Sequence, residues 1–185
     1  MSTNLRNFTK AVYNLDAVVA RVPDGAWDQE SPCEGWTARD VLGHQIGVLK
    51  GVVQAARGED LGMPEAPDSV EDPAGAWAAC RDEVLTALDQ DGALKRSGAY
   101  WFGEMSVDGF IGVVQWDPLI HAWDLAKATG VEHVAEADVA ASSLTTIGGF
   151  AETLRQWGAI GEPVDTADDA DEWTRLLALA GRIPA

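Results

Sequence analysis

The sequence is poor in cysteine and in basic residues. Its 185 residues include two cysteines, Cys33 and Cys80, which are too few for a disulfide framework. Only 13 lysines and arginines accompany 30 aspartates and glutamates, so the formal net charge is −17. A negative field of this size repels phosphate backbones and anionic lipids. We therefore expect no nucleic-acid partner and no membrane partner.

Long apolar runs are also missing. No segment approaches the roughly 18 to 20 apolar residues of a membrane-spanning helix, and no basic start precedes an apolar stretch, as in a secretory signal. Neither an internal repeat nor a strand pattern strong enough to build a sheet is present. The hydrophobic fraction of 46% and the charged fraction of 23% are ordinary for a globular protein. We expect one cytoplasmic domain that spans residues 1–185.

Helical periodicity runs through most of the chain. Clusters of Gly, Pro and Asp separate six expected helices, at residues 5–22, 37–57, 69–91, 107–129, 135–157 and 172–179. Thr37 and Asp40 form a capping-box pattern, and Gly58 and Gly130 are suited to end helices. The irregular stretch at residues 100–102 leaves a short extended segment open. The pattern predicts an all-α fold, an antiparallel four-helix bundle with additional short helical segments.

Charged side chains occupy core positions of two expected helices. Asp117 and His121 continue the apolar spacing of residues 107–129, and their separation of four residues places them on one face. His44 falls between Val41 and Val48 on the inner stripe of another helix. Bundles build metal sites from ligands on facing helices, and two imidazoles with one carboxylate suit Zn²⁺, Ni²⁺ or Fe²⁺. These residues predict one divalent metal, zinc first, with a position open for water or substrate.

Each of these residues has a second interpretation. His44 can be a hydrogen-bonded core residue rather than a ligand. Asp117 precedes Pro118, so it can cap a helix that begins there. We favour a kinked continuous helix, because the apolar spacing continues through the proline. Asp124 follows His121 by one turn, and it either accepts the imidazole N–H of His121 or is a surface or interhelical carboxylate.

Other reactive residues are expected to lie apart from this group. Cys33 precedes the helix that contains His44, and His44 is about two turns into that helix. A rise of 1.5 Å per residue therefore places Cys33 at least about 10 Å from His44. Cys33 and Cys80 are expected to be buried structural thiols. His133, beside Glu132, is expected to be solvated and unrelated to the site. Three of the eight tryptophans lie near the group in sequence, namely Trp36, Trp116 and Trp123. They are expected to pack in the core. The alternative is that one or two of them line a substrate cleft.

Three segments resemble a known family. Residues Ser31–His44 are similar to the TPC-x-GW-T-x-RD-L-x-x-H signature of the DinB/YfiT-like metal-binding proteins. Residues Asp117–Gly130 resemble the D-x-L-x-H-x-WDLA-x-ATG segment of an actinobacterial branch of that family. This branch is related to the N-terminal domain of mycothiol-dependent maleylpyruvate isomerase. Residues Arg175–Arg182 also resemble its usual C-terminal segment, so the resemblance extends over nearly the whole chain.

The resemblance implies a four-helix bundle that holds a metal, often zinc or nickel. It assigns the family's ligands to His44, Asp117 and His121. The middle ligand is glutamate in the isomerase, so Asp117 provides a shorter arm. The isomerase also has a further C-terminal domain for which 185 residues leave no room. We therefore do not expect maleylpyruvate isomerisation.

Three functions are compatible with these expectations. The first is a metalloenzyme that uses a low-molecular-weight thiol of the mycothiol type, as a transferase or a related enzyme, with a bound metal that keeps the sulfur as thiolate. The second is a hydrolase whose metal activates water. The third is a non-enzymatic metal- or ligand-binding stress protein. The incomplete ligand set favours an enzyme, whereas the absence of a separate general base favours the third function. A homodimer is expected only because pairing is common in the family that the chain resembles.

Overall fold

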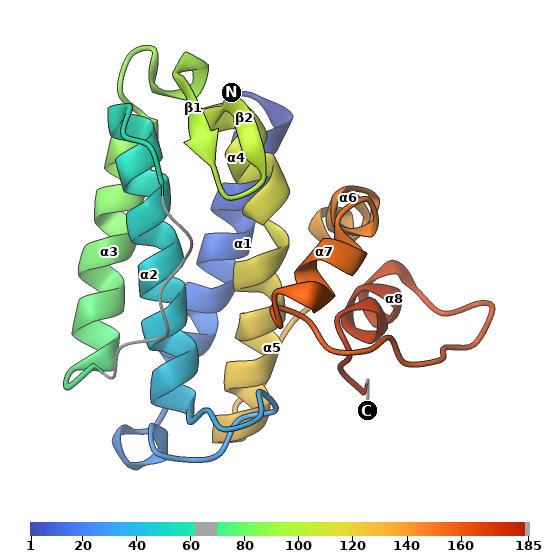
Figure 1. The fold of residues 1–185 in the computed structure, drawn as a ribbon. Helices are drawn as coiled ribbons and strands as arrows, with labels where there is room; N and C mark the ends of the chain where they lie inside the picture. Colours follow the sequence, from blue (N-terminus) through green and yellow to red (C-terminus); the bar gives the residue numbers. More distant parts are fainter. Residues whose placement is uncertain (62–69, 184–185) are drawn as a thin grey trace.

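The computed structural model describes residues 1–61 and 70–183 (Figure 1). This part of the chain is mostly helical and carries one two-stranded antiparallel sheet. None of its helices has the length and apolar character needed to cross a membrane. The elements follow in the order α1 (Thr3–Val19), η1 (Asp24–Ala26), α2 (Ala38–Arg57), α3 (Pro73–Leu88), η2 (Ala93–Lys95), β1 (Ser97–Tyr100), β2 (Gly103–Ser106), α4 (Val107–Val114), α5 (Trp116–Thr129), α6 (Ala137–Gly148), α7 (Ala151–Gln156) and α8 (Glu172–Leu179).

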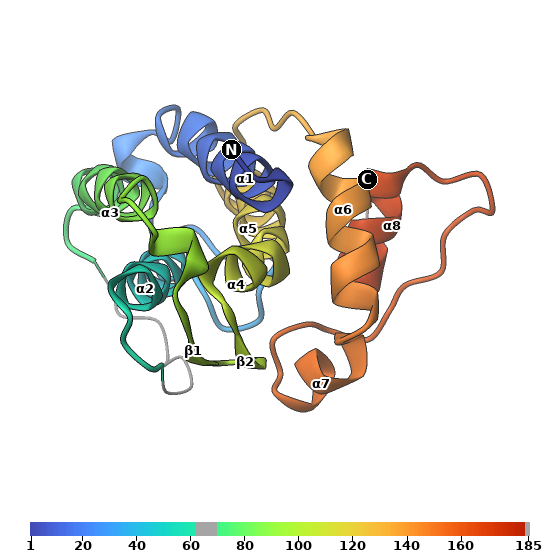
Figure 2. The same ribbon diagram turned by 90° about the horizontal axis from the view of Figure 1, so that it is seen from above.

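The helices form two groups, each with its own apolar core. Helices α1 and α2 lie beside the line formed by α4 and α5, and α3 packs against α2 (Figure 1). Side chains such as Phe8, Leu49 and Phe110 are fully buried in their core. Seen from above, α6, α7 and α8 lie to one side of these helices (Figure 2). Their core joins Ile147 and Leu176 to Leu119 of α5. Helix α5 therefore contributes to both cores, and its polar residues lie close to the junction.

The boundaries of α2 agree with the expected signals. The hydroxyl of Thr37 accepts from the amide of Asp40, while the Asp40 carboxylate accepts from the amide of Thr37 at 2.9 Å. The helix ends at Arg57, and Gly58 follows with φ of +86°, which glycine adopts without the cost of a Cβ atom. The expected capping box is confirmed, and it fixes the residue at which α2 begins.

The fourth expected helix is divided in two. Helix α4 ends at Val114 and α5 begins at Trp116, with Gln115 between them. Pro118 lies four residues after Val114; it has no amide hydrogen to donate to the Val114 carbonyl, and its ring crowds that carbonyl. Because Gln115 keeps helical backbone angles, α5 continues along the line of α4 (Figure 1). Asp117 lies inside α5, so its interpretation as a helix cap is wrong.

Other boundaries differ from expectation. The helix expected at residues 135–157 is two helices, α6 and α7, interrupted at Gly149 and Phe150. The Gly148–Gly149 pair there has low helical propensity. Helix α3 begins after Asp72, which caps it, whereas the expected start at Ser69 lies outside the described residues. The expectation of no sheet is wrong, since β1 and β2 pair on either side of the turn at residues 101–102.

Cys80 has the expected structural role. It is 5% exposed within α3, and its Sγ atom lies 3.6 Å from the carbonyl oxygen of Ile46 on α2. Burial raises the pKa of its thiol to about 11. A thiol with this pKa stays protonated at neutral pH and behaves as a small apolar group.

Close backbone contacts hold the C-terminal segment in place. The amide of Gly161 donates to the carbonyl of Ala180 at 3.2 Å, and the amide of Val164 donates to Ala178 at 3.0 Å. At Gly181 the φ angle is +81°, and a Cβ atom there would lie 2.8 Å from the Cα atom of Gly161. Only glycine permits this approach. The crossing directs the next residue, Arg182, toward the end of α5.

His133 is not solvated, contrary to expectation. Its ring is half-buried and stacks on Trp173 of α8, with 5.0 Å between the ring centroids. Its Nε2 atom lies 2.8 Å from Oδ1 of Asn14 on α1. Burial, reinforced by the charge of Arg21, lowers the pKa of His133 to about 4. This residue therefore connects α1 to α8 in its neutral form.

We predict that the His133→Gln variant is less sensitive to acid than the wild type. Between the unfolded pKa of about 6.5 and the folded pKa of about 4, only the unfolded chain binds a proton at His133. Stability therefore falls as the pH decreases through this range, by at most about 1.4 kcal/mol per pH unit. Urea unfolding of both proteins from pH 7 to pH 4.5 measures the difference. Parallel pH profiles for the two proteins would contradict the prediction.

Candidate metal centre

The structure brings His44, Asp117 and His121 together. The Asp117 carboxylate lies between the two rings, with Oδ2 at 3.2 Å from Nε2 of His44 and Oδ1 at 3.5 Å from Nε2 of His121. The ring centroids are 5.0 Å apart, at an interplanar angle of 71°. One donor atom from each residue can be chosen so that all three lie within 4.8 Å of one another. These three side chains, called the His–Asp–His group below, can converge on a single ion.

Two helices position this group. Helix α2 presents His44 from its second turn, a position determined by the capping box at Thr37. Helix α5 presents Asp117 and His121 one turn apart on the same face. Helices α2 and α5 pack against each other, so the two faces meet. The expected spacing therefore corresponds to a real convergence of side chains.

Burial gives the group unusual electrostatics. Asp117 is 7% exposed and His121 is 5% exposed. Burial on its own would raise the pKa of Asp117, but the charges and hydrogen bonds of His44 and His121 outweigh it and hold the pKa well below its usual range. Burial would likewise lower the pKa of His121, yet Asp117, with hydrogen bonds to Asp124 and Cys33, raises it well above its usual value. The fold thus keeps a carboxylate ionised in its core and requires positive charge beside it.

The donor set fits a divalent metal. Two imidazole nitrogens and an ionised carboxylate oxygen are ligands that zinc, nickel and iron accept. Gln45, fully buried in α2, donates from Nε2 to Oδ2 of Asp117 at 2.6 Å and so orients the carboxylate. Gln45 lies three residues after Leu42 and four before Leu49, so the helical spacing already places it on the apolar stripe of α2, and a search for uncharged polar residues on that stripe would have found it.

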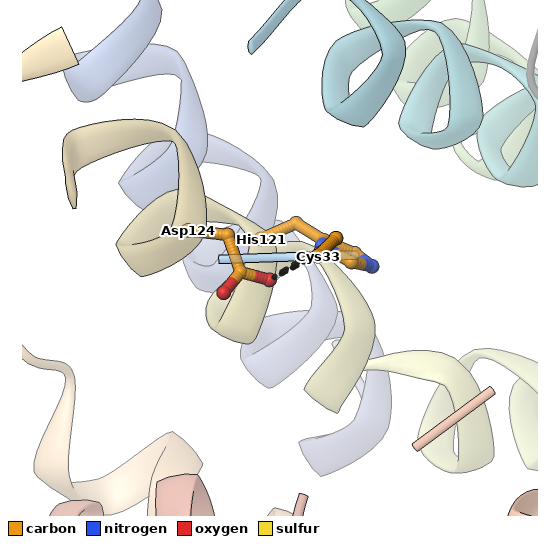
Figure 3. A group of neighbouring side chains, drawn as sticks. All are labelled: Cys33, His121 and Asp124. Atoms are coloured by element: carbon orange, nitrogen blue, oxygen red, sulfur yellow. Dashed lines mark hydrogen bonds and ion pairs between the residues drawn. The ribbon is translucent and has the colours of Figure 1, made fainter. Parts of the chain in front are cut away.

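A second group of side chains lies on the opposite edge of the His121 ring (Figure 3). Nδ1 of His121 is 2.9 Å from Oδ2 of Asp124, which is fully buried. Sγ of Cys33 is 3.2 Å from the same oxygen and 3.9 Å from Nδ1. Of the two interpretations of Asp124, the contact with the His121 imidazole is therefore the one that the structure shows. Asp124 is not a surface carboxylate.

The expected position of Cys33, remote from the site, is wrong. The connector before α2 folds back on itself, because the amide of Ser31 donates to the carbonyl of Trp36 at 2.9 Å and the amide of Trp36 donates to Cys33 at 3.0 Å. Gly35 turns the chain with φ of +78°. Distance along α2 therefore overestimates the separation. Cys33 is half-buried and lies beside His121 rather than in the apolar core.

Arg182 supplies the positive charge for this second group. Its Nη2 atom is 2.8 Å from Oδ2 of Asp124 and 3.3 Å from Sγ of Cys33, and its Nε atom is 3.2 Å from Oδ1 of Asp124. Burial would raise the pKa of Asp124, but hydrogen bonds from His121 and Arg182 lower it to about 2. Cys33, His121 and Asp124 are also close enough to hold an ion. Because a guanidinium already occupies this position, the His–Asp–His group is the better metal site of the two.

A cavity of about 740 Å³ gives access to the His–Asp–His group. His44, Asp117 and His121 line it together with Cys33 and Arg182. Two of the three tryptophans expected near the site, Trp36 and Trp116, also line it, and the ring of Trp36 lies 5.2 Å from that of His44. The arrangement is a group of three candidate ligands, two of them buried, that faces an open space. Metal sites that bind substrate keep an open position of this kind, whereas purely structural sites do not.

The fold and the site define a helical protein with a buried His–Asp–His group at the wall of a cavity. Residues 8–126 match the family described as the mycothiol maleylpyruvate isomerase N-terminal domain, and the chain belongs to this family. The match includes His44, Asp117, His121, Asp124 and Cys33 but ends before α6. The expected family resemblance is confirmed.

Two curated relatives are uncharacterized proteins of Mycobacterium tuberculosis, one from strain H37Rv and one from strain CDC 1551. Each is 30% identical over 128 residues, which cover 69% of this chain and 68% of the relative. No solved structure shows a significant match. The relatives thus support the family and name no reaction.

We predict that the Asp124→Asn variant is unstable and binds metal poorly. The change leaves the Arg182 side chain, which is 12% exposed, without its carboxylate. The free energy of unfolding should fall by about 3–5 kcal/mol, as for other broken buried ion pairs. Zn²⁺ affinity should fall about 10- to 100-fold, since a neutral amide replaces the charged acceptor beside the His121 ring. Urea unfolding and competition with a chromophoric chelator measure the two effects.

Asp138→Asn is the matched control for this variant. It removes a carboxylate that pairs with Lys10 at 2.7 Å on the surface. Exposed pairs contribute little, so its unfolding midpoint and its metal affinity should match those of the wild type. The role assigned to Asp124 is wrong if both variants behave alike.

Proposed function

We propose that this protein is a metal-dependent enzyme that uses a low-molecular-weight thiol of the mycothiol type and transfers it to an electrophile. In this proposal His44, Asp117 and His121 hold one divalent ion, with zinc preferred over nickel or iron. The observation that carries the proposal is the Asp117 carboxylate, held between two imidazoles at the wall of a cavity. The family description, which names mycothiol, supports the choice of thiol.

The residues of the chain have distinct tasks in this proposal. Asp124 accepts a hydrogen bond from Nδ1–H of His121, so the Nε2 atom, which faces Asp117, would be the ligand atom when an ion is bound. Gln45 keeps the Asp117 carboxylate oriented, and Arg182 holds Asp124 in place. A bound divalent ion would supply the positive charge that keeps a thiol as thiolate at neutral pH.

The proposal includes the architecture implied by the family. We regard α1, α2, α3 and the line of α4 and α5 as a four-helix bundle of the DinB type, in which α2 and α5 carry the ligands. Their mutual packing supports this assignment. Maleylpyruvate isomerisation is not part of the proposal, because the family match covers the N-terminal domain of that enzyme alone.

We predict that the wild-type protein, expressed with zinc supplied, carries about one zinc ion per chain and that His44→Ala carries much less. His44 is the most exposed of the three ligands, with 20% of its side chain accessible, so the variant should fold. Elemental analysis gives the stoichiometry. His133→Gln is the control, because it removes a histidine that lies between α1 and α8, and it should keep the metal. A metal-free wild type would refute the metal centre.

We also predict metal-dependent conjugation of a thiol. In the assay, mycothiol reacts with 1-chloro-2,4-dinitrobenzene: the sulfur bonds to the ring carbon, chloride leaves with the bonding electrons, and the thiol proton passes to solvent. The rate should be lost on treatment with a chelator and in His44→Ala, and it should return when zinc is added to the wild type. Turnover of esters without thiol, and no thiol conjugation, would favour a hydrolase instead. Metal binding with neither reaction would favour a binding protein.

A further inference from the structure

Five tryptophan and phenylalanine side chains line the cavity. Trp36 comes from the connector before α2, Trp116 from α5, and Trp157 from the end of α7. The turn between β1 and β2 adds Trp101 and Phe102. These residues come from separate parts of the chain, so the aromatic lining is a property of the folded site and not of one helix face.

The aromatic side chains form two contact groups. In the first, the Trp36 ring lies 5.2 Å from that of His44 and 6.2 Å from that of His121. In the second, Phe102 lies 5.6 Å from Trp157 and 5.4 Å from Phe150, where the strand turn meets α7. Trp157 is 43% exposed although it is a large aromatic residue. A ligand could cover this exposed ring and reach the His–Asp–His group at the same time.

The charges at the cavity do not suit a polyanion. Among the described lining residues, Arg182 is the only arginine or lysine, and its Nε and Nη2 atoms bond to Asp124. Glu34 and Asp117 add negative charge to the lining. With a chain charge of −17, a ligand that carries two carboxylates would be repelled and would find no unpaired guanidinium or ammonium group.

We propose that this cavity binds a flat, apolar and uncharged aromatic molecule, which is the electrophile that receives the thiol. Its ring lies against Phe102 and Trp157, and its reactive carbon faces the His–Asp–His group. Offset and edge-to-face contacts between aromatic rings add to the gain from burying them. A volume of about 740 Å³ is within the range of sites for small organic ligands. The role as electrophile rests on the function proposed above, but the binding itself does not.

Calorimetry with two probes of equal ring size tests the charge preference. The probes are 1-naphthol, which is uncharged at pH 7, and naphthalene-2,6-dicarboxylate, which carries two charges. We expect 1-naphthol to bind to the chelator-treated wild type at least about tenfold more tightly, a difference of about 1.4 kcal/mol; the chelator is needed because a bound zinc ion would itself attract a carboxylate. Equal or tighter binding of the dicarboxylate, or no binding of 1-naphthol, would overturn the proposal.

Two tryptophan variants test the location. Trp157→Ala removes a ring that lines the cavity, and it should weaken 1-naphthol binding about tenfold. Trp123→Ala removes a half-buried ring that pairs with Lys127 on α5, and it should leave the affinity unchanged. Phe102→Leu keeps an apolar side chain and should weaken binding less than Trp157→Ala. Equal losses in the Trp157 and Trp123 variants would show that the ligand lies elsewhere.

The same probe in His44→Ala separates this proposal from the proposed function. We expect 1-naphthol to bind this variant within about threefold of the wild type, because the aromatic wall does not depend on the ion. Binding without any thiol conjugation would refute the proposed function and keep the aromatic site. Thiol conjugation by a protein that does not bind 1-naphthol would refute the aromatic site and keep the proposed function.

Discussion

A carboxylate buried in a helical core needs positive charge beside it, and this need governs the arrangement around Asp117. His44 from α2 and His121 from α5 contact the carboxylate from two sides, and Gln45 adds a hydrogen bond. Removing a carboxylate from water costs several kcal/mol unless such partners are in place. Helices α2 and α5 are thus held together by a polar contact inside an otherwise apolar interface. A divalent ion at this point would supply the positive charge that the Asp117 carboxylate needs.

The helical spacing located the three members of the His–Asp–His group, because a charged residue on an apolar stripe stands out at a period of 3.6. Cys33 and Arg182 could not be found in this way. Their positions depend on the turn at Gly35 and on the crossing at Gly181, which are loop conformations without a repeating pattern. The same limit applies to β1 and β2, whose four-residue strands are too short to show an alternation.

The two edges of the His121 ring face groups that the family match covers to different extents. The Nε2 edge faces Asp117 and His44, which lie within the segment that matches the family. The Nδ1 edge faces Asp124, which is held by Arg182 from beyond that segment. Trp157 also lies beyond it. The family match therefore describes the candidate ligands better than it describes the cavity, and relatives with the same ligands can differ in the molecules they accept.

The hydrogen bond between Arg182 and Cys33 has a consequence for the order of folding. It joins residues 149 positions apart, whereas His44 and Asp117 are 73 positions apart. Closing a longer loop costs more chain entropy, and contacts between distant residues slow folding. A folding chain that has packed α2 against α5 already holds its histidines together while the wall carrying Arg182 is still absent. In a chain that folds in this order, the His–Asp–His group forms before the cavity around it is complete.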